Sequence, residues 1–357
     1  MVTMSDIAAK VGVSRATVSF VLNGRQTENV RIPEATRQRI LDATAELGYR
    51  PNQLAQSVAL GKTRMIGYFV EEPRYEPYWA TIIGALSEAE ELGFTLKVLS
   101  VKKSTLEERL RQAIGLRLSG LIVRFNFDKS AIFEEANRAK IPVITVDEGN
   151  APAFGSLVAA DDASGCREAI KHLIHLGHRR IAFISSGFPR LNSQFNDIGS
   201  AREQLFRREM AQQKLDVPEG YVTRDSMMVY GLQVTDGFDT NTVYEATDSL
   251  LNHPSGRPTA IFCWRDETAM IAIRVCQERG LRVPEDISVV GFSNISAARF
   301  FNPSLSTVQT PWEEMGRLAV TQLLHRLGQD FDPTPTTHLV PTTFIARHSS
   351  GPVHHSN

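Results

Sequence analysis

Short apolar runs alternate with amphipathic stretches from about residue 64 to the end of this 357-residue chain. The runs have the length of buried strands, whereas the stretches between them have the period of helices. Alternation at this spacing predicts parallel β-sheets with helices on both faces. We expect strands at 65–70, 96–99, 121–123, 143–146, 181–184, 260–263 and 287–291, and helices at 79–92, 105–117, 164–176, 200–213 and 266–279.

The length of this α/β region predicts two lobes, because chains longer than one typical domain divide into several units. Ligands of open α/β sheets bind outside the carboxyl ends of the strands. In a two-lobed body, the expected ligand crevice therefore lies between the lobes.

Residues 1 to about 49 follow a different pattern, that of three short helices. Thr3 and Asp6 can form an N-cap pair for the first helix, which Gly12 ends. Ser14 caps a second helix, and Pro33 starts a third. Two short helices around a tight glycine turn predict a helix-turn-helix unit, and the third helix gives it a shared core.

This head is basic, whereas the rest of the chain is acidic. Residues 1–62 contain eight Lys and Arg and five Asp and Glu, a net charge of +3. Since the whole chain has a net charge of −1, the remainder carries −4. A small basic unit on an acidic body favours nucleic-acid binding, and solvated surface charge is the alternative.

Several classes of protein are not expected. The sequence has no apolar run of membrane-spanning length, and no apolar stretch follows a basic start, so we predict neither a membrane span nor a secretion signal. Without Cys-x-x-Cys spacing or an export signal, we interpret Cys166, Cys263 and Cys276 as reduced thiols in the cytoplasm. The Gly-x-Gly-x-x-Gly and Gly-x-Ser-x-Gly motifs are missing, which argues against an enzyme and against a cofactor.

His172, His175 and His178 have spacings that suggest a metal site. The first two lie three residues apart on one predicted helix, but His178 follows Gly177 and lies beyond it. No Cys or acidic residue accompanies them at zinc-finger spacing, so a structural role is the better interpretation.

About twenty positions of the head and of the segment after it agree in order and spacing with one family. They are Asp6-Ile7-Ala8, Gly12-Val13-Ser14, Ala16-Thr17-Val18-Ser19, Val21-Leu22-Asn23-Gly24 and Glu46-Leu47-Gly48-Tyr49-Arg50-Pro51-Asn52. These residues resemble the DNA-binding head of the lactose-repressor and galactose-repressor family of transcription regulators.

The resemblance implies that the second helix lies in the major groove of operator DNA, with Arg15, Ala16 and Phe20 as base readers. Members often have Arg where Phe20 stands, so Phe20 either contacts a thymine methyl group or simply packs. The loop 25–32 is longer than usual, and its arginines either contact phosphates or are solvated. Residues expected to contact phosphates or support the helix are Ser14, Thr17, Ser19, Asn23, Arg31, Tyr49 and Asn52.

Residues 50–63 form a segment that is too short and too weakly capped to be a stable helix alone. In the family, this hinge folds into a helix on the operator, and an apolar side chain wedges into the minor groove. The wedge is usually Leu and corresponds to Val58 here, with Leu54 and Leu60 as rival positions.

The resemblance continues through the body, at 171–182, 281–292 and 306–317. It implies the periplasmic-binding-protein fold, in which the chain crosses between two lobes. On this basis we expect an N-lobe of about 64–161 plus 294–325, and a C-lobe of about 162–293 plus 326–357.

Residues at strand ends, together with the family pattern, give a candidate effector site. The candidates are Tyr78, Trp79, Arg124, Asp161, Arg202, Gln204, Arg265, Asp266 and Ser293. Core packing is the alternative for the two aromatic residues. Members often have Arg, Asn and Asp where Gln204, Arg265 and Ser293 stand, so part of the sugar-binding set is missing. An arginine facing the cleft would favour an anionic group, so a bulkier or acidic ligand, or no small-molecule ligand, is favoured over a neutral monosaccharide.

These expectations describe a cytoplasmic regulator, a repressor in the first instance, that binds a near-palindromic operator as a homodimer or tetramer. A small effector, a sugar or an anionic metabolite, would control it from the inter-lobe cleft. The alternatives are a global regulator of the same fold controlled by a protein co-effector, and a solute-binding protein.

Overall fold

A computed structural model describes residues 2–22, 32–49, 63–71, 73–125, 129–147, 155–186, 198–225, 240–327 and 334–353. The chain divides into two compact units, Met1–Thr63 and Arg64–Asn357. Each unit is considered by itself below, as the head and the body.

Three helices build the head: α1 (Met4–Val11), α2 (Arg15–Leu22) and α3 (Glu34–Glu46). Thr3 and Asp6 form the expected capping box at the start of α1, and Gly12 ends the helix in a left-handed conformation (φ 74°). Apolar side chains of all three helices meet in one small core, which contains Ile7, Ala8, Val11, Val18, Val21, Ile40 and Ala43. The predicted three-helix unit is therefore confirmed.

The first lobe of the body, the N-lobe, contains a six-stranded sheet in the order β11-β5-β4-β3-β1-β2. Its strands are β1 (Met65–Val70), β2 (Thr95–Ser100), β3 (Gly120–Arg124), β4 (Val143–Asp147), β5 (Ser156–Asp161) and β11 (Thr337–Pro341). Every neighbouring pair is parallel. The predicted strand-helix alternation accounts for this arrangement, because parallel neighbours require crossover connections.

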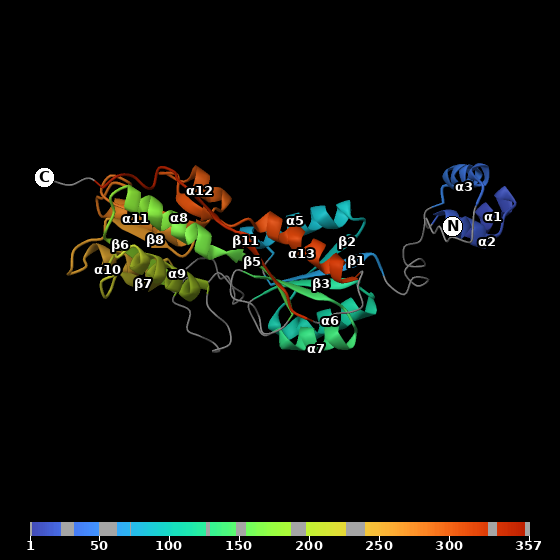
Figure 1. Cartoon of the computed structure of the whole chain (residues 1–357), viewed down its shortest axis with the longest axis horizontal. Coiled ribbons are helices and arrows are strands. Elements are labelled where there is room, and N and C mark those ends of the chain that lie inside the picture. Colours follow the sequence, from blue (N-terminus) through green and yellow to red (C-terminus); the bar gives the residue numbers. More distant parts are fainter. Residues whose placement is uncertain are drawn as a thin grey trace. The chain divides into compact units, whose positions relative to one another are not determined.

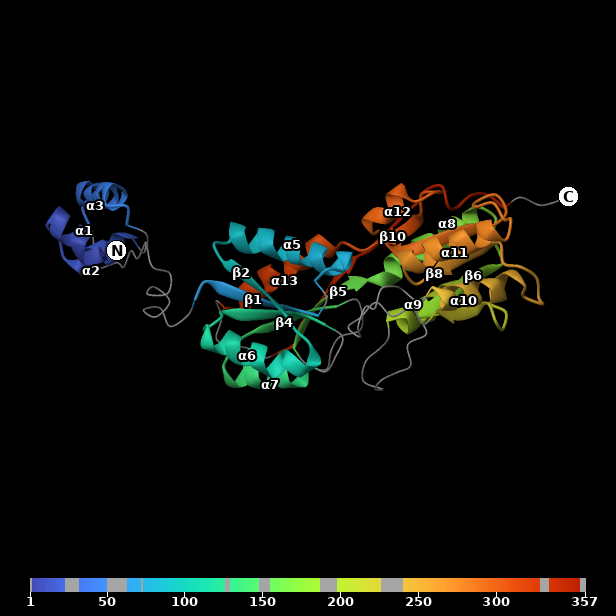
Figure 2. The same cartoon turned by 180° about the vertical axis from the view of Figure 1, so that it is seen from behind.

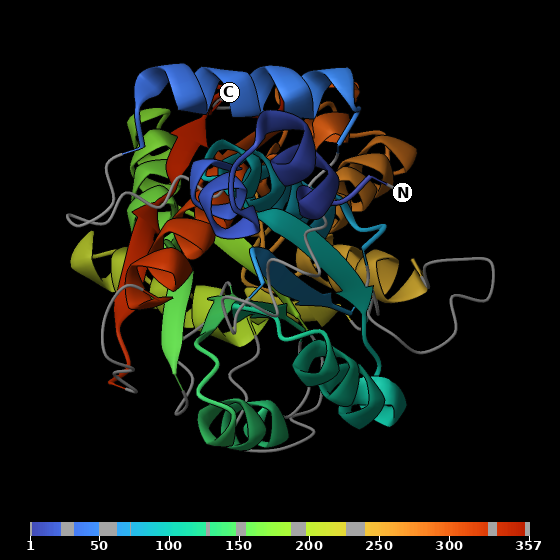
Figure 3. The ribbon, with the colours of Figure 1, turned by 90° about the vertical axis from the view of Figure 1, so that its right-hand side faces the viewer.

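Helices cover both faces of this sheet (Figures 1 and 2). They are α5 (Glu76–Glu91) and α13 (Trp312–Leu327) on one face, and α6 (Leu106–Gly115) and α7 (Ser130–Arg138) on the other. Figure 3 shows α6 and α7, in teal and green, on the same side of the strands. In β1, Tyr68 packs in the core with α5, whereas Phe69 packs in the core with α6, so alternate residues of one strand fill two cores.

The second lobe, the C-lobe, repeats the design with the strand order β12-β10-β9-β8-β6-β7. Its strands are β6 (Ile181–Ser186), β7 (Val222–Asp225), β8 (Ala260–Cys263), β9 (Ser288–Ser293), β10 (Ser306–Gln309) and β12 (Thr343–Ile345). Only β12 is antiparallel to its neighbour in this sheet as described. The helices are α8 (Asp162–His175), α9 (Ile198–Gln212), α10 (Asn241–Leu251), α11 (Asp266–Glu278) and α12 (Ser296–Phe300).

The expected lobe boundaries need correction. The predicted N-lobe includes 294–325, but β10, which falls within that range, lies in the C-lobe sheet beside β9. Residues 326–357 were assigned to the C-lobe, but β11 extends the N-lobe sheet beside β5. The chain therefore crosses between lobes at three places, after β5, after β10 and between β11 and β12. Short exposed edge strands such as β11 carry little apolar pattern, so this last crossing left no sequence signal.

Candidate functional site

Helix α2 presents a polar surface on one side and its apolar residues to the head core on the other. The Ser14 hydroxyl accepts a hydrogen bond from the Thr17 amide (3.0 Å) and therefore caps the helix. Arg15 and Ala16 are exposed in the first turn, whereas Val18 and Val21 are buried. This is the arrangement that a base-reading helix needs, because its first-turn side chains must be free of the core.

The other DNA-contacting candidates occupy different environments. Ser19 and Phe20 are half-buried. In the described part of the head, the Phe20 side chain does not pack against the core. Tyr49 does pack against that core, which favours a supporting role. The candidates Asn23, Arg31, Asn52 and Val58, as well as Arg25, lie outside the described residues.

Helix α3 contacts the turn between α1 and α2, which sets the orientation of α2. Its Arg39 donates a hydrogen bond from Nη2 to the carbonyl oxygen of Val11 (2.6 Å), at the end of α1. Lys10 on α1 and Glu46 at the end of α3 form an ion pair of 2.5 Å. The turn between α1 and α2 is thus held by a charged group on the neighbouring helix.

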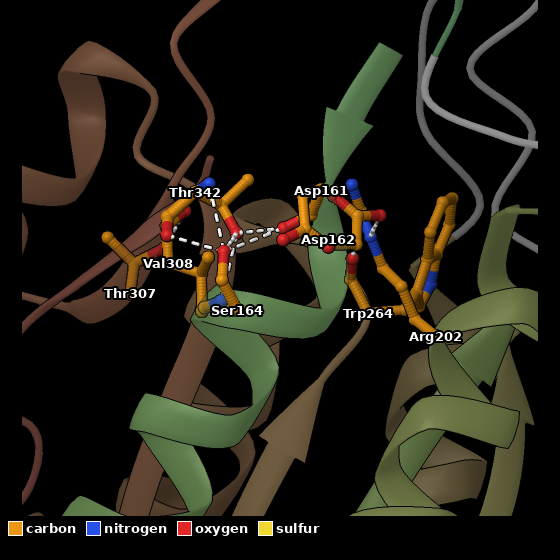
Figure 4. A network of polar contacts seen from close by, with 9 residues as sticks. Asp161, Asp162, Ser164, Arg202, Trp264, Thr307, Val308 and Thr342 are labelled. Atoms are coloured by element: carbon orange, nitrogen blue, oxygen red, sulfur yellow. Dashed lines mark hydrogen bonds and ion pairs between the residues drawn. The ribbon is translucent and has the colours of Figure 1, made fainter. Parts of the chain in front are cut away.

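In the body, two of the chain crossings are joined by hydrogen bonds (Figure 4). The Ser164 hydroxyl lies between the carbonyl oxygens of Asp161 (2.9 Å) and Thr342 (2.8 Å). The Thr342 hydroxyl donates to the carbonyl oxygen of Asp161 (2.7 Å) and accepts from the Gly165 amide (3.0 Å). Gly165 also approaches Val308 so closely that a Cβ atom at this position would overlap its side chain. The hinge between the lobes is therefore tightly packed.

Arg202 lies beside this hinge and is almost fully buried, with 2% of its surface exposed. Its Nε donates to Asp162 (2.8 Å), its Nη1 donates to the carbonyl oxygen of Trp264 (2.7 Å), and its guanidinium stacks on Phe292 (3.7 Å). Burial raises the pKa of Asp162, and the Arg202 charge opposes that rise. Oδ1 of Asp162 has no hydrogen-bond partner in the described structure, so one carboxylate oxygen can still accept a bond.

Trp264 and Arg265 follow β8 and share a second polar cluster with the buried Asp225 at the end of β7. Trp264 Nε1 and the Thr268 hydroxyl both donate to Asp225 (2.9 and 2.6 Å). The Arg265 guanidinium lies over the Trp264 ring (4.4 Å), and its Nε contacts the Thr268 hydroxyl (3.4 Å). Trp264 thus links the candidates Arg202 and Arg265 to one another. Arg265 is only 2% exposed, so its side chain is buried and does not face solvent in this structure.

On the N-lobe side, Arg124 ends β3 and lies buried among aromatic rings. Its guanidinium is 4.4 Å from the ring centre of Tyr78 and 4.6 Å from that of Trp312. It donates to the carbonyl oxygen of Pro77 (2.6 Å) and to the Thr81 hydroxyl. The structure therefore brings Arg124 and Tyr78 together, at the point where α5 and α13 begin.

The remaining effector candidates are distributed differently. Trp79 is 42% exposed and Gln204 is exposed. Asp161 is half-buried at the end of β5, and Ser293 is buried at the end of β9. Asp266 is fully buried and accepts hydrogen bonds from the Ile295 amide and the Thr307 hydroxyl, and burial raises its pKa to about 7. Both Asp266 oxygens are thus already bonded within the C-lobe.

Four residues of these clusters were not predicted as site residues: Asp225, Trp264, Thr310 and Trp312. The latter two lie on the crossing from β10 to α13, and Thr310 Oγ1 and Trp312 Nε1 are buried without a hydrogen-bond partner in the described structure. Buried polar atoms of this kind generally find a partner. Their position after a strand was the available signal, but β10 was not predicted as a strand.

Comparisons with known proteins agree with this geometry. Residues 3–52 match the model of bacterial regulatory proteins of the lacI family. Residues 63–195 match the periplasmic binding proteins and sugar binding domain of the LacI family, and residues 170–350 match a periplasmic binding protein-like domain. The HTH-type transcriptional repressor PurR of Proteus mirabilis (strain HI4320) is 33% identical over 348 residues, 96% of this chain and 95% of that protein.

The chain belongs to the LacI family. The PurR repressor of Erwinia tasmaniensis is 32% identical over 97% of this chain and 96% of its own length. The solved structure of the lac repressor dimer bound to operator and the anti-inducer ONPF is 26% identical with a TM-score of 0.76, covering 98% of this chain and 99% of that one. The solved structure of a transcriptional regulator CelR–cellobiose complex contains a chain that is also 26% identical, with a TM-score of 0.65. The match covers 98% of this chain and 100% of that chain.

Membership of the LacI family makes the chain a helix-turn-helix transcriptional repressor with an effector-binding body. It also confirms the predicted fold class, and the prediction that the chain is not an enzyme.

The histidine cluster has structural partners. His178 contacts the Thr259 hydroxyl and the carbonyl oxygen of Gly351 (both 3.0 Å), and His172 contacts Ser350 (3.0 Å). Among the described residues, no three His, Cys, Asp or Glu side chains gather as a metal site would require. Cys166, Cys263 and Cys276 are free and buried. In the described ranges, no helix combines the length and apolar composition that a bilayer crossing needs.

Proposed function

We propose that this LacI-family repressor binds a near-palindromic operator as a homodimer, with α2 of each head in the major groove. The observation that carries the proposal is the exposed, polar first turn of a capped helix whose opposite face is buried in the head core. Two heads related by two-fold symmetry would read two half-sites of opposite orientation.

An apolar stripe on α5 supports the dimer. Trp79, Ile83 and Leu86 are spaced for one face of the helix and are 42%, 46% and 36% exposed. Val98 on the edge strand β2 adds a further exposed apolar side chain (42%). Exposed apolar surface of this kind typically marks a protein interface. The second copy of the chain is the partner we propose for it, and the lac repressor dimer is a precedent.

We propose that a small polar effector binds where the strand ends of the two lobes meet. The buried polar atoms at the crossings support this position, because Asp162 Oδ1 can accept a bond and Trp312 Nε1 can donate one. Asp162 offsets the charge of Arg202, which weakens the case for an anionic metabolite, so a sugar-like ligand is the first candidate. An anion remains the second candidate because of Arg265. Because a repressor acts on chromosomal DNA, we propose that the protein works in the cytoplasm.

Selection of binding sites from random duplex DNA by the purified full chain tests the operator proposal. We expect enrichment of a near-palindromic sequence, and binding that weakens steeply with salt, with a log–log slope of about −0.9 per phosphate contact. Sedimentation of the free protein at the same concentrations should show a dimer. Absence of an enriched sequence, or enrichment of single half-sites by a monomer, would contradict the proposal.

A further inference from the structure

The loop between β9 and α12 is held to the C-lobe by the side chains of Arg347 and Asp266. Arg347 donates from Nη2 to Asn294 Oδ1 (2.6 Å). The next amide, that of Ile295, donates to Asp266 Oδ2 (2.8 Å). The Arg347 anchor is a charged group, and hydrogen bonds to charged groups are stronger than neutral ones. The position of this loop on its own lobe is therefore well defined.

The following residue, Ser296, is bound by the other lobe. Both its amide and its hydroxyl lie 2.7 Å from Glu76 Oε1 and donate to it. Ser296 is the first residue of α12 in the C-lobe, whereas Glu76 is the first residue of α5 in the N-lobe. Backbone amides at the start of a helix have no acceptor within that helix. Here the Glu76 carboxylate of the N-lobe accepts the hydrogen bond from such an amide in the C-lobe.

The backbone before this contact is unusual. Ser293 and Asn294 have φ values of 117° and 54°, a region that non-glycine residues seldom adopt. Two consecutive residues of this kind persist only where the surrounding contacts hold them. Arg347, Asp266 and Glu76 provide those contacts, and Glu76 is the one that belongs to the N-lobe.

The same loop begins at the proposed effector site. Ser293 ends β9, and Asp266 follows Arg265 directly in the chain. A ligand that moves Ser293 or Arg265 therefore displaces the loop at one end, while Glu76 holds it at the other. This arrangement links occupancy of the site to a contact between the lobes.

We propose that Glu76 is a positioning residue that fixes the spacing of the two lobes through Ser296. The consequence for effector response rests on the proposed function, whereas the contact itself and its effect on lobe spacing do not. Loss of the carboxylate removes both hydrogen bonds, so the lobes should sample a wider range of separations.

The test uses the full chain without DNA or effector. Hydrogen exchange measures protection of the Ser296 amide, and small-angle X-ray scattering measures lobe spacing. In Glu76→Ala, the Ser296 amide should exchange roughly tenfold faster and the scattering curve should change. In Glu76→Gln, which keeps an acceptor oxygen, both effects should be smaller. Ser296→Ala loses the hydroxyl bond only and should resemble Glu76→Gln.

Glu90→Ala is the matched control, because Glu90 is an exposed acid on the same helix. It should leave the exchange rate and the scattering curve unchanged. If Glu76→Ala speeds exchange at Ser296 but leaves the scattering curve as it was, Glu76 only caps α12 and the proposal is wrong. If Glu76→Ala lowers the unfolding temperature too far for these measurements, Glu76→Gln decides between the same outcomes. Failure to find an operator would leave these results unaffected.

Discussion

Gly84 on α5 packs directly on Glu313 of α13, so closely that a Cβ atom on the glycine would overlap the carbonyl oxygen of Glu313. A second glycine, Gly316, meets Thr81 from the opposite helix in the same way. Because both obstacles are backbone atoms, they cannot rotate away. The packing of α5, which carries most of the proposed dimer face, on α13 therefore depends on glycine at their crossing.

Gly84→Ala should push these helices apart and destabilise the body. Overpacking of a dense core costs about 1–3 kcal/mol, and the backbone contact places this substitution at the upper end. Thermal or urea unfolding measures the effect. Gly115→Ala on α6 is the control, since a Cβ atom there has nothing within 4 Å. Equal stability of the two variants would show that α5 and α13 can separate at little cost.

Arg15→Ala should weaken operator binding by about 1–3 kcal/mol and relax one symmetric base position, because a bidentate arginine–guanine contact discriminates by that amount. Titrations on the selected operator and on single-base variants measure it. Because Arg15 is exposed, the substitution should leave unfolding unchanged. An equal loss of affinity on every sequence would mean that Arg15 contacts only phosphate.

Stability should fall below neutral pH because of His178. Burial lowers the pKa of His178 to about 4, from 6.5 in the unfolded chain. The neutral form is favoured by the fold, so its contribution is complete above pH 6.5 and declines as the pH falls toward 4. At pH 5 the loss is about 2 kcal/mol. Unfolding of His178→Gln should depend less on pH over this window, and the exposed His325→Gln should behave like the unsubstituted protein.

Arg265→Asn restores the residue common in the family and should change which ligands bind. A thermal-shift screen of sugars and anionic metabolites against both proteins measures this change. Arg265 stacks on Trp264, so a loss of about 1 kcal/mol in stability is also expected. Operator affinity of the ligand-free protein should stay nearly constant. Loss of DNA binding would instead assign Arg265 to the lobe interface.

Val58 is the proposed minor-groove wedge, although it lies outside the described residues. Val58→Leu adds one methylene, worth roughly 0.8 kcal/mol of burial per chain, and should tighten operator binding. Val58→Ala should loosen it, and DNA bending should change in parallel. Gel mobility of bent-DNA probes measures both quantities. If Val58→Ala leaves affinity and bend unaltered, Leu54 or Leu60 is the better assignment.

Helices and strands with a strong hydrophobic periodicity were predicted from the sequence, whereas several without it were missed. The strand at Met65–Val70 and the helix at Asp266–Glu278 lie within a residue of the expected ranges because apolar period and length agree there. The strand β7 (Val222–Asp225) has four residues, three of them polar or charged, and it was missed. Helix α7 was missed as well, although its apolar residues are buried.

Prediction of the candidate site was limited for a related reason. Arg202, Arg265 and Asp162 were found from position and resemblance, but the carboxylate of Asp225 was not. Asp225 meets Trp264 and Thr268 from a strand 39 residues or more away in sequence, and no local pattern reports such a contact. Both arginines are buried and hydrogen-bonded, and this burial likewise depends on tertiary packing that the local sequence does not reveal.

The return of the chain to the N-lobe has a consequence for synthesis on the ribosome. Helix α13 and strand β11 complete that lobe, yet at Trp312–Leu327 and Thr337–Pro341 they follow the C-lobe strands β6 to β10 in the chain. The described residues of the head form their own core, all of it within residues 4–49. A nascent polypeptide therefore acquires a folded head early, whereas the N-lobe stays unfinished until most of the C-lobe has been synthesised.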